Sequence, residues 1–188
     1  AEVTESNAVD DGTLTLTAVS AGSGLVLLQT FSGFDGEVVS VTYTVDVVPL
    51  DQYDNPVDPL ISQLSLTDGT GNILTTFSTA PPHSVGTHTV TLPAPYAIAA
   101  GSTYGIRWWL QGYTIHIGMA YSNGDYAGGA LTTPTGSGES AGDDLTFTVT
   151  GRVPLAFITT NPVLTAQATA SAGVSVDYVQ RVPVDYAA

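Results

Sequence analysis

The chain has 188 residues and a formal net charge of -14, because 17 acidic side chains are balanced by only 3 arginines and lysine is absent. With 43% hydrophobic and 11% charged residues, it is too apolar for intrinsic disorder and long enough to build one domain core. So few cations exclude a nucleic-acid partner, since little offsets the repulsion of phosphates. Such a surface suits a salt-rich medium, since the Debye length at about 1 M salt is roughly 3 Å; an ordinary acidic protein is the alternative.

The predicted elements are almost all β-strands, because apolar and polar residues alternate with a period of two. Thr13–Thr17 and Thr42–Val47 show the pattern, which puts apolar and polar side chains on opposite faces of a strand. Further strands, rich in β-branched or aromatic residues, are predicted at 25–32, 60–67, 72–79, 85–92, 103–111, 113–121, 144–151, 155–160, 162–170 and 173–182. Helical periodicity is nearly absent, so we expect an all-β fold, an antiparallel sandwich of two sheets.

Turns and loops separate these strands at Gly, Pro and Asp residues. Residues 68–72, Asp-Gly-Thr-Gly-Asn, tolerate positive φ and predict a hairpin turn between Leu66 and Ile73. Proline-containing stretches at 49–59 and 80–82 mark longer connections, because proline cannot donate to a ladder. The stretch 122–142, rich in Gly, Ser and Thr, is the longest predicted loop, and loops of that length are usually functional or mobile.

We expect a single domain with strand-forming extensions at both ends. Residues 1–28 form an N-terminal strand or hairpin extension, 29–151 the sandwich core, and 152–188 a C-terminal set of strands. The C-terminal strands either complete the same sandwich or form an arm that adds a strand to a neighbouring subunit. The first residues lack the basic and apolar regions of a signal peptide, and no apolar run approaches the ~20 residues of a membrane span, so we expect folding in the cytoplasm.

From residue 29 to residue 149 the order of features resembles a sandwich domain repeated in bacterial and archaeal surface proteins and in phage structural proteins. The residues that carry the resemblance are Gln29-Thr30-Phe31, Leu64–Asp68 followed by Gly69, Tyr96–Ile106, Tyr126–Gly129 and Asp143–Phe147. The resemblance implies a jelly-roll-like antiparallel β-sandwich that serves as a binding or structural module, without shared catalytic residues.

The acidic, lysine-free composition, the size and the strand-rich ends are also similar to those of small single jelly-roll capsid proteins of haloarchaeal viruses. This likeness implies a structural virion protein, a capsid or capsid-attached subunit, made in the host cytoplasm and located in the virion. Its partners would be copies of itself and other virion proteins. The alternative is a carbohydrate-binding or adhesive module of a cell surface or viral spike, with a host surface glycan as its partner.

The residue types needed for catalysis do not converge in the sequence. The chain has no cysteine, and its histidine bases, His83, His88 and His116, accompany no nucleophile elbow in a strand-to-helix setting. Asp143 and Asp144 form a conspicuous carboxylate pair, but adjacent strand residues point to opposite faces and would not flank one glycosidic bond. We therefore expect no enzymatic activity.

Calcium is the cofactor that the sequence favours most, because hard cations bind clustered carboxylates and carbonyls. The candidate ligands are Asp51, Asp54 and Asp58 in a proline-containing loop, and Asp125 with Asp143 or Asp144 if the long loop folds back. Their spacing is not that of an EF-hand. The alternative is that these carboxylates keep acidic loops hydrated, in which case no cofactor is required.

Five aromatic residues are candidates for binding a glycan or a protein partner, because flat exposed rings stack on sugars and anchor interfaces. They are Trp108, Trp109, Tyr113, Tyr121 and Tyr126. Alternation sends Trp108 and Trp109 to opposite faces of a strand, so one is expected in the core and the other on the surface or in an interface. Core packing is the alternative for the whole set.

Overall fold

The computed structural model describes residues 2–8, 10–18, 25–50, 53, 61–110, 115–124, 126–132 and 143–153. They lie in the first of two units of the chain, Ala1–Leu155. All regular elements in these residues are β-strands, which confirms the predicted all-β class. No helix with the length and apolar character needed to cross a membrane occurs in this part of the chain. The predicted C-terminal strands beyond Val153 lie outside the described residues.

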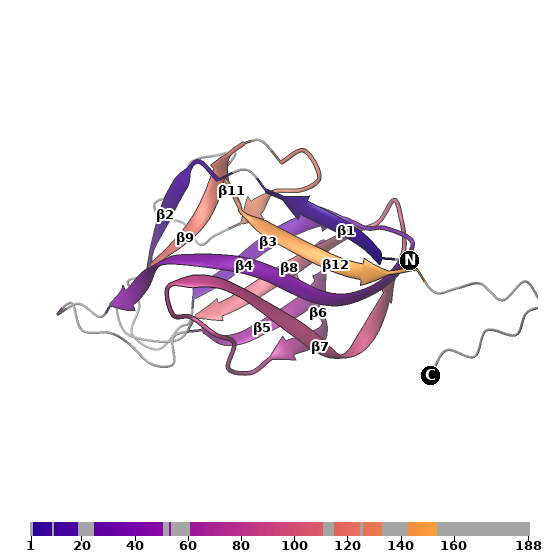
Figure 1. Ribbon diagram of the computed structural model, residues 1–188, viewed down its shortest axis with the longest axis horizontal. Helices are drawn as coiled ribbons and strands as arrows, with labels where there is room; N and C mark the ends of the chain where they lie inside the picture. The colour runs from indigo at the N-terminus through magenta and orange to yellow at the C-terminus, as the bar shows by residue number, and fades with distance from the viewer. Residues whose placement is uncertain are drawn as a thin grey trace, which may run out of the picture. The chain divides into compact units, whose positions relative to one another are not determined.

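The described strands form two antiparallel sheets. The larger sheet contains β1 (Glu2–Asn7), β2 (Gly12–Ala18), β4 (Gly36–Leu50), β7 (Gly86–Ile98), β9 (Ile115–Asn123), β11 (Asp143–Leu145) and β12 (Phe147–Arg152). The smaller sheet has the order β10 (Leu131–Thr132), β3 (Leu25–Ser32), β8 (Thr103–Leu110), β5 (Ile61–Asp68) and β6 (Ile73–Ser78). β1, β12, β4 and β7 run side by side in one layer, in front of β3, β8, β5 and β6 (Figure 1).

The connectivity of the sandwich is that of a jelly roll. β1 pairs with β12, β3 with β8, β4 with β7 and β5 with β6, so the chain is a long hairpin of nested pairs. Rolling that hairpin up joins β12 to β4 in one sheet and β8 to β5 in the other. The remaining described strands are additions, with β2 between β1 and β3 and with β9, β10 and β11 between β8 and β12. The predicted jelly-roll-like sandwich is confirmed.

The N-terminal extension is built into the larger sheet. β1 pairs with β12 from Glu2 opposite Arg152 to Asn7 opposite Phe147, and β2 pairs with β9 along its whole length. β9 in turn pairs with the last part of β4. The segment before the first strand of the predicted core therefore supplies one of the nested jelly-roll strands and one added strand.

Two strand boundaries differ from the prediction for identifiable reasons. β7 continues past residue 92 through Pro93 and Pro95, and its ladder with β4 is interrupted there. Among the described strands β7 pairs only with β4, and an edge strand tolerates proline because its outer edge has no ladder to lose. The predicted strand 144–151 is divided at Thr146, because β11 pairs with β9 whereas β12 pairs with β4.

The core lies between the two sheets and follows the alternation of the strands. Its largest fully buried side chains are Trp108, Tyr43, Phe31, Phe147, Leu27, Ile61, Leu64, Leu66, Ile106 and Leu110. Tyr43 of the larger sheet meets Trp108 of the smaller one edge to face, with ring centroids 5.9 Å apart. Burial of each large apolar side chain is worth about 1.5–3 kcal/mol, so these contacts hold the sheets together in a chain without disulfides.

The turn between β5 and β6 has the chemistry that the sequence predicts. Asp68 Oδ1 accepts hydrogen bonds from the backbone N–H groups of Thr70 and Asn72 at 2.9 and 3.0 Å, and Oδ2 accepts from Asn72 Nδ2 at 2.9 Å. Gly71 has φ +91°, a left-handed conformation that glycine adopts without strain. The predicted hairpin turn is confirmed, and one carboxylate organises it.

Replacing Asp68 with Asn tests this turn through its pH dependence. Hydrogen bonds from Asn72 and Thr70 hold the pKa of Asp68 well below its usual range. The ionised carboxylate therefore stabilises the fold above its unfolded pKa of about 3.9, and this contribution is lost as the pH falls towards the folded pKa. We expect Asp68→Asn to lower the free energy of unfolding at neutral pH and to matter less in acid, as measured by urea titration. A difference in the free energy of unfolding between parent and variant that stays constant into the acid range would contradict this account.

Candidate functional site

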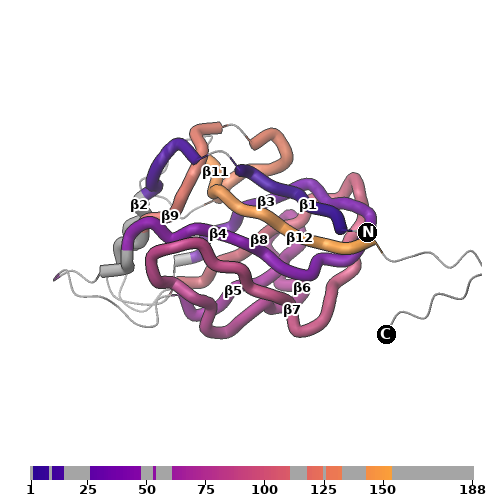
Figure 2. The backbone as a smooth tube through the Cα atoms, viewed as in Figure 1, coloured from indigo at the N-terminus to yellow at the C-terminus, as the bar shows by residue number. Residues whose placement is uncertain are grey.

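The outer face of the larger sheet carries a continuous array of hydroxyl side chains. Val41, Tyr43 and Val45 of β4 point into the core, so their neighbours along the strand point outward. The array, which we call the hydroxyl face, consists of Thr4 and Ser6 on β1, Thr148 and Thr150 on β12, Ser40, Thr42 and Thr44 on β4, and Thr87, Thr89 and Thr91 on β7. It crosses four adjacent strands, with β12 running between β1 and β4 (Figure 2).

The register of the strands lines these hydroxyls up in rows. In one row Ser6 lies opposite Thr148, which lies opposite Thr42, which lies opposite Thr89. The hydroxyls of Thr42 and Thr89 are hydrogen-bonded at 2.8 Å, and those of Thr44 and Thr87 at 2.9 Å. β-branched side chains are stiff, and these bonds hold them further, so little side-chain entropy remains to be lost when the face is covered.

Among the residues that the structure describes, charged groups occur at the two ends of the hydroxyl face and not between them. At one end Arg152 Nε forms an ion pair with Glu37 Oε2 at 2.8 Å, beside Glu2 on the neighbouring strand. At the other end Asp46 accepts a hydrogen bond from Thr13 at 2.9 Å. In a chain with a net charge of -14, the part of this face between those ends is neutral.

A shallow hollow of about 220 Å³ opens on the hydroxyl face. It is lined by Asn7, Ala8, Thr42, Tyr43, Thr44, Thr87, Thr146, Phe147 and Thr148. The rings of Tyr43 and Phe147 are only 1% and 2% exposed, so the hollow presents hydroxyl groups rather than an aromatic platform for a sugar ring.

A buried polar cluster joins the sheets next to the added strands. Gln29 of β3 accepts a hydrogen bond from the backbone N–H of Leu145 at 2.7 Å and donates to Asp144 Oδ1 at 2.8 Å. Asn7 of β1 donates to Ser122 Oγ at 2.6 Å and to the Leu145 carbonyl at 3.0 Å. These hydrogen bonds connect β11, a strand of the larger sheet, to β3 of the smaller sheet and to β1. A buried network whose polar groups have their partners in place favours one arrangement of strands.

Of the six predicted calcium ligands, the described residues include Asp143 and Asp144, so neither predicted cluster is tested. Asp143 and Asp144 lie on β11 opposite Asn123 and Ser122, and both are buried. Asp144 is held by Gln29 and by the backbone N–H of Leu131. Within the described ranges no three acidic or histidine side chains are grouped so that they could hold a metal ion. The other predicted ligands, Asp51, Asp54, Asp58 and Asp125, lie outside the described residues.

The predicted aromatic set divides between the core and the surface. Trp108 is fully buried, whereas Trp109 is half-buried on the outer face of the smaller sheet, which confirms their opposite orientation. Tyr126 is buried edge-on against Phe147 and donates its hydroxyl to Glu5 at 2.8 Å. The partly buried Tyr121 packs against the core. Tyr113 lies outside the described residues, and the described members do not form one site.

Sequence reasoning missed both the hydroxyl face and the buried polar cluster. The signal for the face is present, since Thr87, Thr89 and Thr91 recur with a period of two, but its extent depends on which strands become neighbours. Gln29 occupies an inward position between Leu27 and Phe31, where a polar residue breaks the alternation. A buried amide predicts a hydrogen-bond partner without identifying it.

Comparison with known proteins leaves function to be inferred from this geometry. No protein-family model matches the chain, and no curated protein matches it.

His83 and His88 have ring nitrogens 3.3 and 2.7 Å from the backbone carbonyls of Pro81 and Ser84, which gives these histidines local partners in the loop before β7. The hydroxyl face, which spans four adjacent strands, is the described surface feature from which we infer a function.

Replacing Asp144 with Asn should show a pH dependence opposite in sign to that of Asp68. Burial raises the pKa of Asp144, partly offset by hydrogen bonds from Gln29 and Leu131. The contribution of protonated Asp144 to stability is fully present below the unfolded pKa of about 3.9. It is lost as the pH rises through the raised pKa of the folded state. Asp144→Asn should therefore gain stability relative to the parent between acid and neutral pH, measured by urea titration. A trend matching that of Asp68→Asn would refute this account of the polar cluster.

Proposed function

We propose that this chain is a structural virion protein of a halophilic archaeal virus, a capsid or capsid-attached subunit that packs against copies of itself and other virion proteins. The observation that carries the proposal is the neutral hydroxyl face on a strongly acidic jelly-roll sandwich. A jelly roll is an architecture from which shells are built, although it also serves lectins and other binding proteins. The fold alone therefore does not distinguish assembly from ligand binding, and the chemistry of the surface is the basis for choosing between them.

Electrostatics favours the hydroxyl face as the place where subunits meet. Two copies with a net charge of -14 repel one another wherever carboxylates approach, and like charges across an interface cost several kcal/mol. The hydroxyl face avoids that cost because its charges lie at the ends and Arg152 is already paired with Glu37. At about 1 M salt the remaining repulsion is screened within roughly 3 Å. Assembly of such subunits should therefore strengthen as salt is added.

A carbohydrate-binding or adhesive module is the second candidate, and Trp109 is the observation in its favour. Its ring is half-buried on the outer face of the smaller sheet, where a sugar could stack. The hollow on the hydroxyl face offers no exposed ring, and Trp108 and Tyr126 are buried. One surface tryptophan is a smaller feature than a neutral four-stranded face, so we place assembly first.

Introducing charge into the hydroxyl face tests the proposal. We expect the parent protein to form defined oligomers between low and multimolar salt, measured by light scattering. The double variant Thr42→Glu with Thr89→Glu places two carboxylates in the centre of the face and should weaken association by at least about tenfold. Circular dichroism verifies that each variant keeps its β-fold.

A matched control separates position from net charge. Thr79→Glu with Ser102→Glu adds the same charge at two exposed sites outside the hydroxyl face and should assemble like the parent. A parent protein that stays monomeric at every salt concentration would refute the proposal. Equal weakening in both double variants would show that overall charge, and not the hydroxyl face, controls association.

A further inference from the structure

The outer face of the smaller sheet has a different chemistry from the hydroxyl face. Ile106, Trp108 and Leu110 of β8 point into the core, so Arg107 and Trp109 between them point outward. The register places Val26 and Gln63 on either side of Trp109, and Leu28 and Ser65 on either side of Arg107. We call the outward residues Val26, Leu28, Gln63, Arg107 and Trp109 the Trp-Arg patch.

The patch is well packed. Leu28 crosses over Gly105, where a Cβ atom would lie 2.6 Å from Leu28 Cδ1 and 2.7 Å from Thr67 Oγ1. Thr67 is fully buried although its position faces outward, and so is Ser65. Side chains therefore cover the sheet around Arg107 and hold the patch in place, as in the ordered centre of a protein interface.

Arg107 lacks the partner that the other described arginine has. Arg152 is ion-paired with Glu37, whereas the guanidinium of Arg107 forms no ion pair or hydrogen bond with any residue that the structure describes. Acidic side chains are plentiful among the described residues, so the lack of a described partner for the Arg107 guanidinium does not reflect a shortage of carboxylates. A half-buried guanidinium beside Trp109 and Leu28 is suited to a carboxylate from another molecule, because Arg and Trp are the residues most enriched at interface centres.

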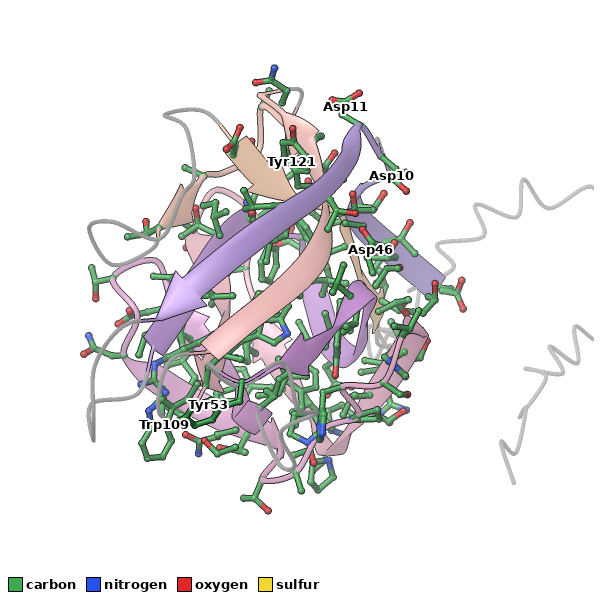
Figure 3. All side chains as sticks on the ribbon, turned by 90° about the vertical axis from the view of Figure 1, so that its left-hand side faces the viewer. Asp10, Asp11, Asp46, Tyr53, Trp109 and Tyr121 are labelled. Carbon is green, nitrogen blue, oxygen red and sulfur yellow. The ribbon has the colours of Figure 1, made fainter. Side chains whose placement is uncertain are left out.

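The acidic turn between β1 and β2 supplies carboxylates of the required kind. Asp10 and Asp11 are exposed, and each uses one carboxylate oxygen to accept a backbone N–H, from Gly12 at 3.0 Å and from Asn123 at 2.8 Å. On the side of the molecule drawn in Figure 3, Asp10 and Asp11 lie at one end and Trp109, with Tyr53, at the other. Copies placed end to end would bring the acidic turn of one against the Trp-Arg patch of the next.

We propose that the Trp-Arg patch binds the Asp10–Asp11 turn of a second copy of this chain. This inference rests on the proposed function, because it identifies a contact of an assembling subunit. The contact joins two different surfaces, so it is head-to-tail and generates rings or open chains, whereas like faces meeting through the hydroxyl face generate two-fold pairs. The subunit then has two chemically distinct ways to contact its copies.

Matched variants test the patch at the salt concentration where the parent protein assembles. Arg107→Gln, Trp109→Ala and the double variant Asp10→Asn with Asp11→Asn should each weaken association by about tenfold or more, measured by light scattering and sedimentation. Thr79→Glu changes the net charge by the same amount at an exposed site outside both surfaces and should leave association unchanged. Equal behaviour of Arg107→Gln and Thr79→Glu would overturn the inference.

Charge reversal tests the pairing itself. Copies with Arg107→Glu and copies with Asp10→Arg and Asp11→Arg should each fail to extend alone and should associate when mixed, because the mixture restores opposite charges across one contact. Failure of the mixture to associate would overturn the inference. The inference would also be overturned if the protein bound a glycan on an array and this binding were lost in Trp109→Ala but retained in Arg107→Gln.

The outcomes separate this inference from the proposed function. If the hydroxyl-face variant fails to assemble and the Trp-Arg variants assemble normally, the proposed function stands and the head-to-tail contact is wrong. A parent protein that remains monomeric at every salt concentration would overturn both.

Discussion

The pairing of β4 with its neighbours is the constraint on which the core and both candidate surfaces depend. β4 pairs with β12 and β9 on one side and with β7 on the other, so it is the central strand of the larger sheet. Its inward Tyr43 packs edge-on against Trp108 of β8, and this contact fixes which side of β8 carries Trp109. Its outward Thr42 and Thr44 meet hydroxyls of β7. One alternation therefore determines the apolar interior, the hydroxyl face and the position of the Trp-Arg patch.

The described acidic residues are distributed so that most of them avoid both the core and the centres of the sheet faces. Among the described acidic residues, Asp10, Asp11, Asp35 and Asp68 lie in turns and loops, where carboxylates stay hydrated or accept backbone hydrogen bonds. Asp144 is the costly exception, since burial raises its pKa, and it is tolerated because Gln29 and Leu131 donate hydrogen bonds to it. Among the described residues, the centre of the hydroxyl face is therefore free of carboxylates, which is what the proposed contact between copies requires.

Local pattern predicts the elements of this fold well and their assembly less completely. The alternation of β3 and β8, the turn at Asp68 and the opposite orientation of Trp108 and Trp109 all follow from residues near one another in the sequence. The partner of Gln29 does not, because Asp144 is 115 positions away and only the rolled hairpin brings them together. The hydroxyl face also could not be predicted locally, because it depends on which strands become neighbours. A threonine in one strand becomes part of this surface only when the register aligns four strands.

The two proposed contacts should respond differently to added salt. A contact between neutral hydroxyl faces gains from salt, because screening removes repulsion between the surrounding carboxylates while the contact itself carries no charge. A contact between Arg107 and a carboxylate loses Coulomb energy under the same screening, although burial of Trp109 and Leu28 protects part of it. Low salt would therefore favour the head-to-tail contact over the face-to-face contact, and high salt the reverse. If the proposed subunit uses both contacts, assembly through both is expected only at salt concentrations where neither contact is weak, so the weaker contact would limit assembly at each end of the salt range.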